Sequence, residues 1–312
     1  MKKFVLTFLI FTIGLEVLVR TTTVPWIFEP SFSQIGSLRS VEKEMFKANN
    51  PKIVFLGNSL TRDAVSPLIV SDNLNLNKKE VLNLGLSAGN YFIDEYLLNS
   101  FKVKPEIIFL QVDIGRFEYD QIEDNYYFIK YSKLNDWNTI SKYWYSPDNF
   151  LTSVSKLYAS RDIWHRFVFF RNESENIGEI IKKDQLGQFE VYKNNKTLNE
   201  GDFDLQKYKN YKETVDGSNS LIYLKKICKF SQENNINLNF IHMPIKIESD
   251  SKEADIVNDF LLYIEKECSG VQGVYNFANF NFENNNIFLD YGHLNNIGAE
   301  EFSKNFKISY EK

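Results

Sequence analysis

Short apolar runs, each long enough for one buried strand, constrain the fold of this chain more than any other sequence feature. Four clear runs and one weaker run lie at residues 52–56, 81–85, 106–110, 237–244 and 273–277. Runs of this length are typical of strands that a parallel sheet buries on both faces. Helical patterns accompany them, at about residues 91–101, 220–234 and 254–268. The alternation predicts an α/β fold with a mostly parallel, doubly wound sheet in three α/β/α layers, and ligands at the carboxyl ends of the strands.

This rhythm fails between about residues 115 and 215, where tyrosine, tryptophan and phenylalanine are abundant. A hundred residues do not form a plain loop in a compact domain. We therefore predict one domain over residues 51–312 with a large, partly helical insertion at about residues 115–215. Its aromatic side chains are more often core than binding surface, and docking to a partner or a membrane is the alternative.

A basic head and an apolar run begin the chain. Lys2 and Lys3 precede the run FVLTFLIFTIGL, and Glu16 follows it. This pattern is typical of an export signal, and neither an A-x-A-like cleavage site nor a cysteine for lipid attachment follows. The pattern predicts an uncleaved single-pass anchor in the cytoplasmic membrane over residues 1–22 and a stalk over residues 23–50, with the body outside the cytoplasm. Cleavage of the segment stays an open alternative.

Glu16 needs an explanation of its own, because a carboxylate within a bilayer is costly. One interpretation places it near the outer interface, where it is tolerated. The other pairs it with a polar group on a membrane partner.

Charge and cysteine content narrow the classes of function. A net charge of −5 without a long basic stripe argues against a nucleic-acid partner. Cys228 and Cys268 lack the spacing of metal ligands. Two buried, unpaired thiols are the simpler interpretation, and a disulfide is the alternative in an exported protein. The chain has no nucleotide-binding or flavin motif, so we expect neither a cofactor nor a metal.

The tripeptide Gly57-Asn58-Ser59 follows the first apolar run, where α/β enzymes place their chemistry. A serine hydroxyl needs a base to become a nucleophile. Of the three histidines, His293 has the best context, because Asp290 precedes it by three residues near the C-terminus. Residues at this spacing can share one face of a turn, so the carboxylate can hold one ring nitrogen while the other faces the serine. Either pattern alone is also common at structural positions.

Together these residues give the chain a resemblance to the SGNH hydrolase superfamily. The blocks that carry it are VFLGNSLTR at residues 54–62, NLGLSAGN at 83–90 and FLDYGHLNNIGA at 288–299. The resemblance covers about residues 51–114 and 217–306, and it implies a three-layer α/β/α fold. It also implies that Ser59 is the nucleophile, that Asp290 and His293 complete a catalytic triad, and that the backbone N–H of Gly85 stabilises the oxyanion.

The chain departs from the family pattern after the third predicted strand. The family usually offers an asparagine there as a second oxyanion donor, and this chain reads FLQVDIGR at residues 109–116. An ionised Asp113 accepts hydrogen bonds but cannot donate them. Gln111 or Asn90 is the candidate replacement.

Three other polar residues lie in or near the predicted site, and a third histidine lies elsewhere. Arg62 either faces an anionic substrate or pairs with a nearby aspartate. Arg116 is expected in a surface salt bridge. His242 ends the fourth predicted strand and is expected to be structural, although it could line the pocket. His165 lies in the predicted insertion and is expected to be structural.

The whole layout is similar to that of the extracytoplasmic SGNH proteins that work beside membrane-bound O-acyltransferases. These are the proteins of alginate and peptidoglycan O-acetylation and of teichoic acid D-alanylation. The resemblance implies a serine acyl-enzyme that transfers or removes an O-acyl group, such as acetyl, on a cell-surface polysaccharide, with a membrane-bound O-acyltransferase as a partner. Two alternatives stay open: a simple carboxylic-ester hydrolase with the same triad, and a non-catalytic accessory protein that binds a glycan or the acyltransferase.

Overall fold

The computed structural model describes residues 2–21, 41–42, 44–45, 47–48, 50–86, 89–118, 151, 155, 158, 205–246, 252–283 and 287–306. The chain divides into two compact units, one formed by Met1–Gly36 with Gln121–Ile180 and the other by Ser37–Asp120 with Ile181–Lys312. The second unit contains the sheet and the candidate site.

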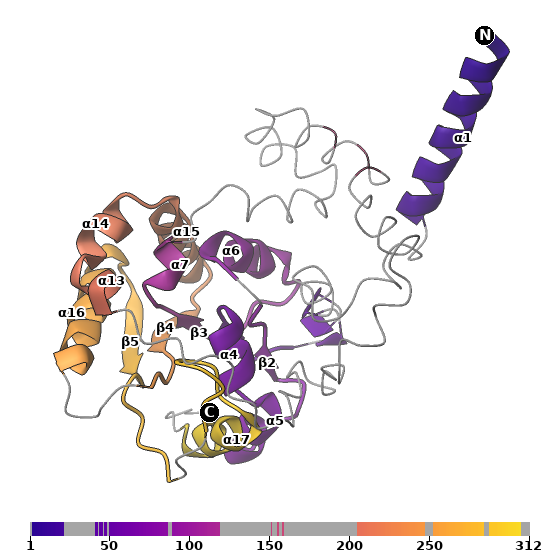
Figure 1. The fold of residues 1–312 in the computed structure, drawn as a ribbon. Helices are drawn as coiled ribbons and strands as arrows, with labels where there is room; N and C mark the ends of the chain where they lie inside the picture. Colours follow the sequence, from indigo (N-terminus) through magenta and orange to yellow (C-terminus); the bar gives the residue numbers. More distant parts are fainter. Residues whose placement is uncertain are drawn as a thin grey trace. The chain divides into compact units, whose positions relative to one another are not determined.

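The described strands form one parallel sheet (Figure 1). They are β1 (Ile53–Leu56), β2 (Val81–Asn83), β3 (Ile107–Gln111), β4 (Asn237–His242) and β5 (Val271–Asn276). Their order is β2-β1-β3-β4-β5, and each neighbouring pair is parallel. The predicted α/β fold with a parallel sheet is confirmed. In this strand order the chain winds one way from β1 and the other way from β3, so the crevice between the ends of β1 and β3 is the usual place for a ligand.

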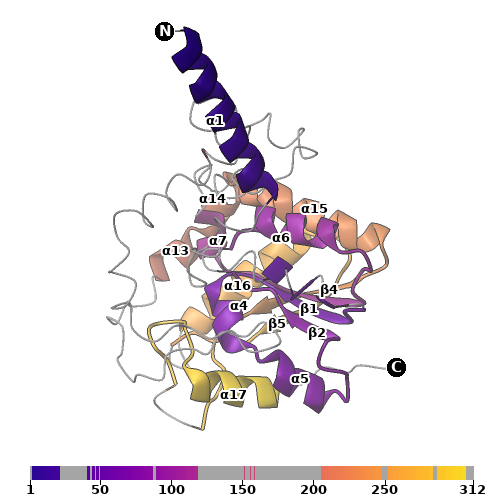
Figure 2. The same cartoon turned by 90° about the vertical axis from the view of Figure 1, so that its right-hand side faces the viewer.

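Helices cover both faces of this sheet (Figure 2). The described helices are α4 (Ser59–Ala64), α5 (Pro67–Asn73), α6 (Tyr91–Ser100), α7 (Gly115–Glu118), α13 (Leu205–Lys209), α14 (Tyr211–Asp216), α15 (Asn219–Glu233), α16 (Lys252–Glu267) and α17 (Asn296–Asn305). In both views α6 and α15 lie on one side of the strands, whereas α5 and α17 lie on the other.

Successive residues of β1 point to opposite faces of the sheet and join two different cores. Val54 and Leu56 pack in the cluster that contains the apolar side chains of α6, α15 and α16. Ile53 and Phe55 pack in the cluster that contains those of α5 and α17. All four side chains are fully buried, and each contributes about 1.5–3 kcal/mol by leaving water. This two-sided burial explains why the run is apolar at every position.

The main core extends into both ends of the segment that was predicted to be an insertion. Phe117 of α7, Tyr208 of α13 and Val215 of α14 are buried in the same cluster as the sheet. Both ends of the predicted insertion therefore pack against the sheet. The remainder of that segment, residues 119–204, lies outside the described residues except for positions 151, 155 and 158.

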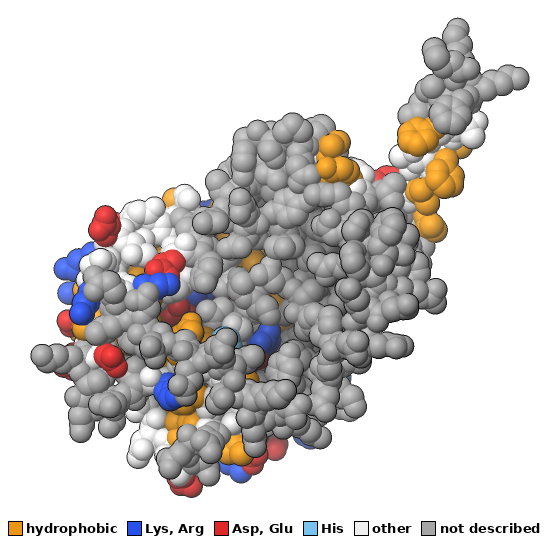
Figure 3. Space-filling model, viewed as in Figure 1, with side chains coloured by type: hydrophobic (Ala, Val, Ile, Leu, Met, Phe, Trp, Pro, Cys, Tyr) orange, Lys and Arg blue, Asp and Glu red, His pale blue; other side chains and the backbone are white. Residues whose placement is uncertain are grey.

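Helix α1 (Lys2–Thr21) carries the apolar run of the N-terminus. Large apolar side chains are exposed along it (Figure 3): Leu6, Phe8, Ile10, Phe11, Ile13, Val17 and Leu18. Among the described helices, none combines the length and the hydropathy expected of a membrane crossing. The carboxylate of Glu16 accepts a hydrogen bond of 2.8 Å from the Ser155 hydroxyl, so this residue has a polar partner within its own chain.

Cys228 in α15 and Cys268 just after α16 form a disulfide, with 5.9 Å between their Cα atoms. The simpler interpretation of two unpaired thiols is therefore wrong. The two residues are 40 positions apart in sequence, and closing a loop of this length stabilises the fold by about 4 kcal/mol in the chain-entropy model. The bridge holds α15 to the end of α16 beside the sheet.

Candidate active site

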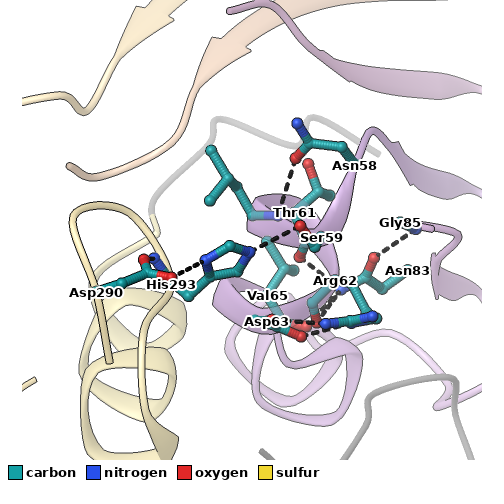
Figure 4. Close-up of polar contacts among 11 residues, drawn as sticks. Asn58, Ser59, Thr61, Arg62, Asp63, Val65, Asn83, Gly85, Asp290 and His293 are labelled. Atoms are coloured by element: carbon teal, nitrogen blue, oxygen red, sulfur yellow. Dashed lines mark hydrogen bonds and ion pairs between the residues drawn. The ribbon is translucent and has the colours of Figure 1, made fainter. Parts of the chain in front are cut away.

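Ser59 lies at the switch point between β1 and β3. Strand β1 ends at Leu56, and Ser59 opens α4 three residues later. Its Oγ is 2.7 Å from Nε2 of His293, although the two residues are 234 positions apart in sequence (Figure 4). The structure therefore brings together the two residues on which the predicted chemistry depends.

Asp290 holds the other side of the His293 ring. Its Oδ2 is 2.7 Å from Nδ1 of His293, and its Oδ1 accepts the backbone N–H groups of Gly292 at 2.9 Å and of His293 at 2.8 Å. An antiparallel β-bridge between Phe288 and Leu294 closes the loop that carries Asp290 and His293. Because a carboxylate can only accept, Nδ1 carries the proton and Nε2 is free to accept the proton of the serine hydroxyl.

Asp290 stays ionised in this arrangement. Its burial by itself raises the pKa of the carboxyl group, but the hydrogen bonds from the His293 ring and from two backbone N–H groups outweigh it and lower the pKa to about 2. A fixed negative charge beside His293 favours the imidazolium that forms when the ring takes a proton.

Gln111 and Asn58 fix the turn that carries Ser59. The side-chain oxygen of Asn58 accepts the Leu60 N–H at 2.9 Å and so caps α4. The buried Gln111 Oε1 accepts the Asn58 N–H at 2.9 Å and the Thr61 hydroxyl at 2.7 Å. No acceptor for the Ser59 N–H lies within the described part of the chain. The nucleophile is thus held from both sides, and its own N–H stays available.

Asp113 accepts hydrogen bonds from the side-chain amides of both Gln111 and Asn58. Both NH2 groups donate to its Oδ2 atom. Burial raises the pKa of Asp113 above its usual value, and the Arg116 guanidinium and the backbone N–H groups of Gly115 and Arg116 offset this only in part. The Gln111 and Asn58 amides and the backbone N–H groups of Gly115 and Arg116 all donate to this carboxyl group, so Asp113 acts as an acceptor and supplies no hydrogen bond to a substrate. Gln111 is one of the two candidate oxyanion donors, but its NH2 group already donates to Asp113 and its oxygen holds the turn.

Gly85, the donor implied by the resemblance, has its N–H engaged elsewhere. It donates to Asn83 Oδ1 at 2.9 Å. A Cβ at Gly85 would lie 2.4 Å from the Arg62 backbone nitrogen, so the glycine is needed for this close approach to α4. The Asn83 amide in turn donates to the carbonyls of Thr61, Arg62 and Val65. Gly85 and Asn83 therefore join the end of β2 to the helix that carries Ser59.

Sequence reasoning missed Asn83. The available signal was a single asparagine inside an apolar run, at a position that the structure buries. A buried amide must find partners for its NH2 group and its oxygen. Asn83 finds them in α4 and in Gly85, and this could not be read from its neighbours in sequence.

Asn90 caps α6. Its Oδ1 accepts the Ile93 N–H at 3.1 Å, and the residue is 5% exposed. Within the described residues, its NH2 group has no acceptor.

The two arginines near the site both pair with aspartates. Arg62 makes a two-pronged pair with Asp63, at 2.6 and 2.8 Å. Arg116 was expected at the surface, and this is wrong, because it is 1% exposed and paired with the fully buried Asp94. It also donates to the backbone carbonyls of Gly89 and Gln111. Arg116 therefore ties together the segments that follow β2 and β3.

His242 is the second histidine near the ends of the strands, and it is buried. Its Nδ1 is 2.9 Å from the Met243 carbonyl and its Nε2 is 2.9 Å from the Tyr208 hydroxyl. Burial lowers the pKa of His242 to about 4, although the bond to Met243 opposes this shift. His242 is therefore neutral at neutral pH, in agreement with the expected structural role. His165 lies outside the described residues.

Comparisons with protein-family models, with curated proteins and with solved structures find no match to this chain. Among the described residues, no group of three or more histidine, cysteine, aspartate or glutamate side chains is arranged to hold a metal ion. What the site can do must therefore be argued from its own geometry. That geometry is a serine hydroxyl, an imidazole and a carboxylate joined in line.

Proposed function

We propose that this chain is an SGNH-type serine enzyme that transfers or removes an O-acyl group, such as acetyl, on a cell-surface polysaccharide. One observation carries the proposal. Ser59, His293 and Asp290 form a chain of two hydrogen bonds of 2.7 Å each, at the switch point of a parallel sheet. This is the arrangement that activates a serine for acyl transfer.

The first half of the reaction makes an ester on Ser59. Its Oγ attacks the ester carbonyl of the substrate while His293 Nε2 takes the hydroxyl proton. The charged ring is stabilised by Asp290, whose pKa of about 2 keeps it ionised. The Ser59 N–H donates to the oxyanion of the tetrahedral intermediate. His293 then gives its proton to the leaving alcohol oxygen, and the acyl group stays on Ser59.

The second half removes the acyl group. A hydroxyl of the glycan, or a water molecule, attacks the acyl-serine and gives its proton to His293. The Ser59 oxygen leaves and takes this proton back. Transfer and hydrolysis differ only in the acceptor, so the simple esterase is the same site with water as its second substrate.

Two features support a place at the outer side of the cytoplasmic membrane. Apolar side chains are exposed along α1, as expected for a segment that meets lipid. The disulfide between Cys228 and Cys268 fits an oxidising compartment.

The test is covalent labelling of the full-length chain in membranes with a fluorescent fluorophosphonate. The membranes are first washed with alkaline carbonate, and we expect the chain to stay in them. We expect the parent to be labelled, Ser59→Ala to be unlabelled and His293→Ala to be labelled at least about 100-fold more slowly. Ser231→Ala is the matched control, because Ser231 lies in α15 and its hydroxyl has no partner among the described residues.

A folded parent that is not labelled would contradict the enzyme and favour the non-catalytic accessory protein. If labelling succeeds, p-nitrophenyl acetate with and without a polysaccharide acceptor separates the two activities. Acetylated glycan indicates transfer, and free acetate alone indicates hydrolysis.

A further inference from the structure

The proposed acyl transfer requires more than one hydrogen-bond donor at the oxyanion, because the charge that develops there must be stabilised by fixed dipoles. The Ser59 N–H is one such donor. The Gly85 N–H is bonded to Asn83 and leaves the second position without a donor. The candidates for this second donor are the side-chain amides that surround the nucleophile.

Four side-chain amides lie at or just beyond the ends of β1, β2 and β3, namely Asn58, Asn83, Gln111 and Asn90. The NH2 groups of Asn58 and Gln111 donate to Asp113, and that of Asn83 donates to three backbone carbonyls of α4 and Val65. Asn90 differs from the other three. Its NH2 group has no acceptor within the described part of the chain, although the residue is only 5% exposed.

The orientation of the Asn90 amide is set by α6. Ile93 offers an N–H at 3.1 Å, so the atom that it meets must be the carbonyl oxygen of the amide. The NH2 group therefore occupies the other corner of the amide and points away from the N–H groups of the helix. A donor that is held in place before the reaction stabilises a developing charge without reorganisation.

The residue directly before Asn90 contacts the turn that carries Ser59. Gly89, directly before it, approaches the Gly57 carbonyl so closely that a Cβ on Gly89 would lie 2.6 Å from that oxygen. The Leu86 N–H donates to the same carbonyl at 3.0 Å. The segment that ends in Asn90 thus packs directly on the backbone two residues before the nucleophile.

We propose that Asn90 is a further catalytic residue, whose side-chain NH2 group donates to the oxyanion together with the Ser59 N–H. This proposal rests on the proposed acyl-enzyme function. The segment after β3 offers no free hydrogen-bond donor to the oxyanion. Asn90, at the start of α6, takes this role in its place.

Two substitutions separate the donor from the helix cap. Asn90→Asp and Asn90→Ser both keep a side-chain oxygen for the Ile93 N–H, since aspartate and serine are good cap residues, but neither keeps the NH2 group. Asn90→Ala loses both. The full-length protein in detergent is assayed with p-nitrophenyl acetate, and its Tm is measured alongside.

We expect Asn90→Asp and Asn90→Ser to lower kcat by about 10²–10³-fold with KM changed less than about threefold. Their Tm should stay close to that of the parent, whereas Asn90→Ala lowers Tm by about 2–4 °C. The neutral serine variant shows that the loss does not come from the negative charge of the aspartate.

If the parent turns over the ester and both cap-keeping variants retain its kcat, Asn90 is only a cap and the inference is overturned while the proposed function stands. If the parent neither turns over the ester nor reacts with the fluorophosphonate, both proposals fall together. The two failures are therefore distinguishable.

Discussion

The two sides of Ser59 differ in how far they are open to solvent. On one side, the side chains of His293 and Asp290 are 26% and 17% exposed. On the other side, the polar network behind the nucleophile is closed, with Arg116 at 1% and Asp94 at 0%. A group that must exchange protons with a substrate needs access, whereas a group that fixes a turn needs rigidity. The difference indicates that the first side carries the chemistry and the second holds its geometry.

Substitution of Asp290 should have the largest effect on the open side. Asp290→Asn removes the charge beside His293 and offers an NH2 group that can favour the wrong tautomer of the ring, so we expect kcat for p-nitrophenyl acetate to fall by about 10⁴-fold. The Tm should change little, because both groups are partly exposed. Asp259→Asn, an exposed position in α16, is the matched control. Retention of more than a tenth of the parent kcat would contradict the role of Asp290.

Substitution of Arg116 should act on stability first. Arg116→Met leaves Asp94 buried without its cation, and one oxygen of that carboxylate already has no partner in the described residues. We expect the free energy of unfolding in urea to fall by about 3–5 kcal/mol. The double variant Arg116→Met with Asp94→Leu should recover most of this loss, since neither charge remains buried.

The exposed pair of Lys225 and Glu267 provides the comparison for that result. Lys225→Met should cost less than about 1 kcal/mol. If the single Arg116 variant is as stable as the Lys225 variant, the closed side does not depend on its buried ion pair and the contrast between the two sides is lost.

A pH dependence that comes from His242 should be smaller than the effect of Arg116. The pKa of this residue is about 4 in the folded protein and 6.5 in an ordinary environment. Between these values the unfolded chain binds more protons, so folding stability is full above pH 6.5 and falls as the pH decreases toward 4. We expect the parent to lose about 2 kcal/mol more than His242→Gln between pH 7 and pH 5. Urea unfolding at both pH values measures this, and parallel losses in the two proteins would show that His242 is not a buried neutral group.

The sequence predicted the sheet because burial on both faces leaves a continuous apolar run at each strand. The positions of β1 to β4 and of α6, α15 and α16 agree with that prediction within a few residues. It also predicted the pairing of Asp290 with His293, since residues three apart in a tight loop meet through local geometry alone. In both cases the information is contained in a short stretch of chain.

Only the tertiary structure decided which donors near Ser59 are free. The sequence offered the Gly85 N–H as one oxyanion donor and Gln111 or Asn90 as the replacement for the missing asparagine, and what separates these groups is whether another group already accepts their hydrogen bonds. Asn83 engages the Gly85 N–H, and Asp113 engages the Gln111 amide. The disulfide and the burial of Arg116 were decided in the same way, since each depends on contacts between segments far apart in sequence. Whether a buried polar group has a hydrogen-bond partner depends on which segments pack around it. Only the folded structure therefore shows which donors are free.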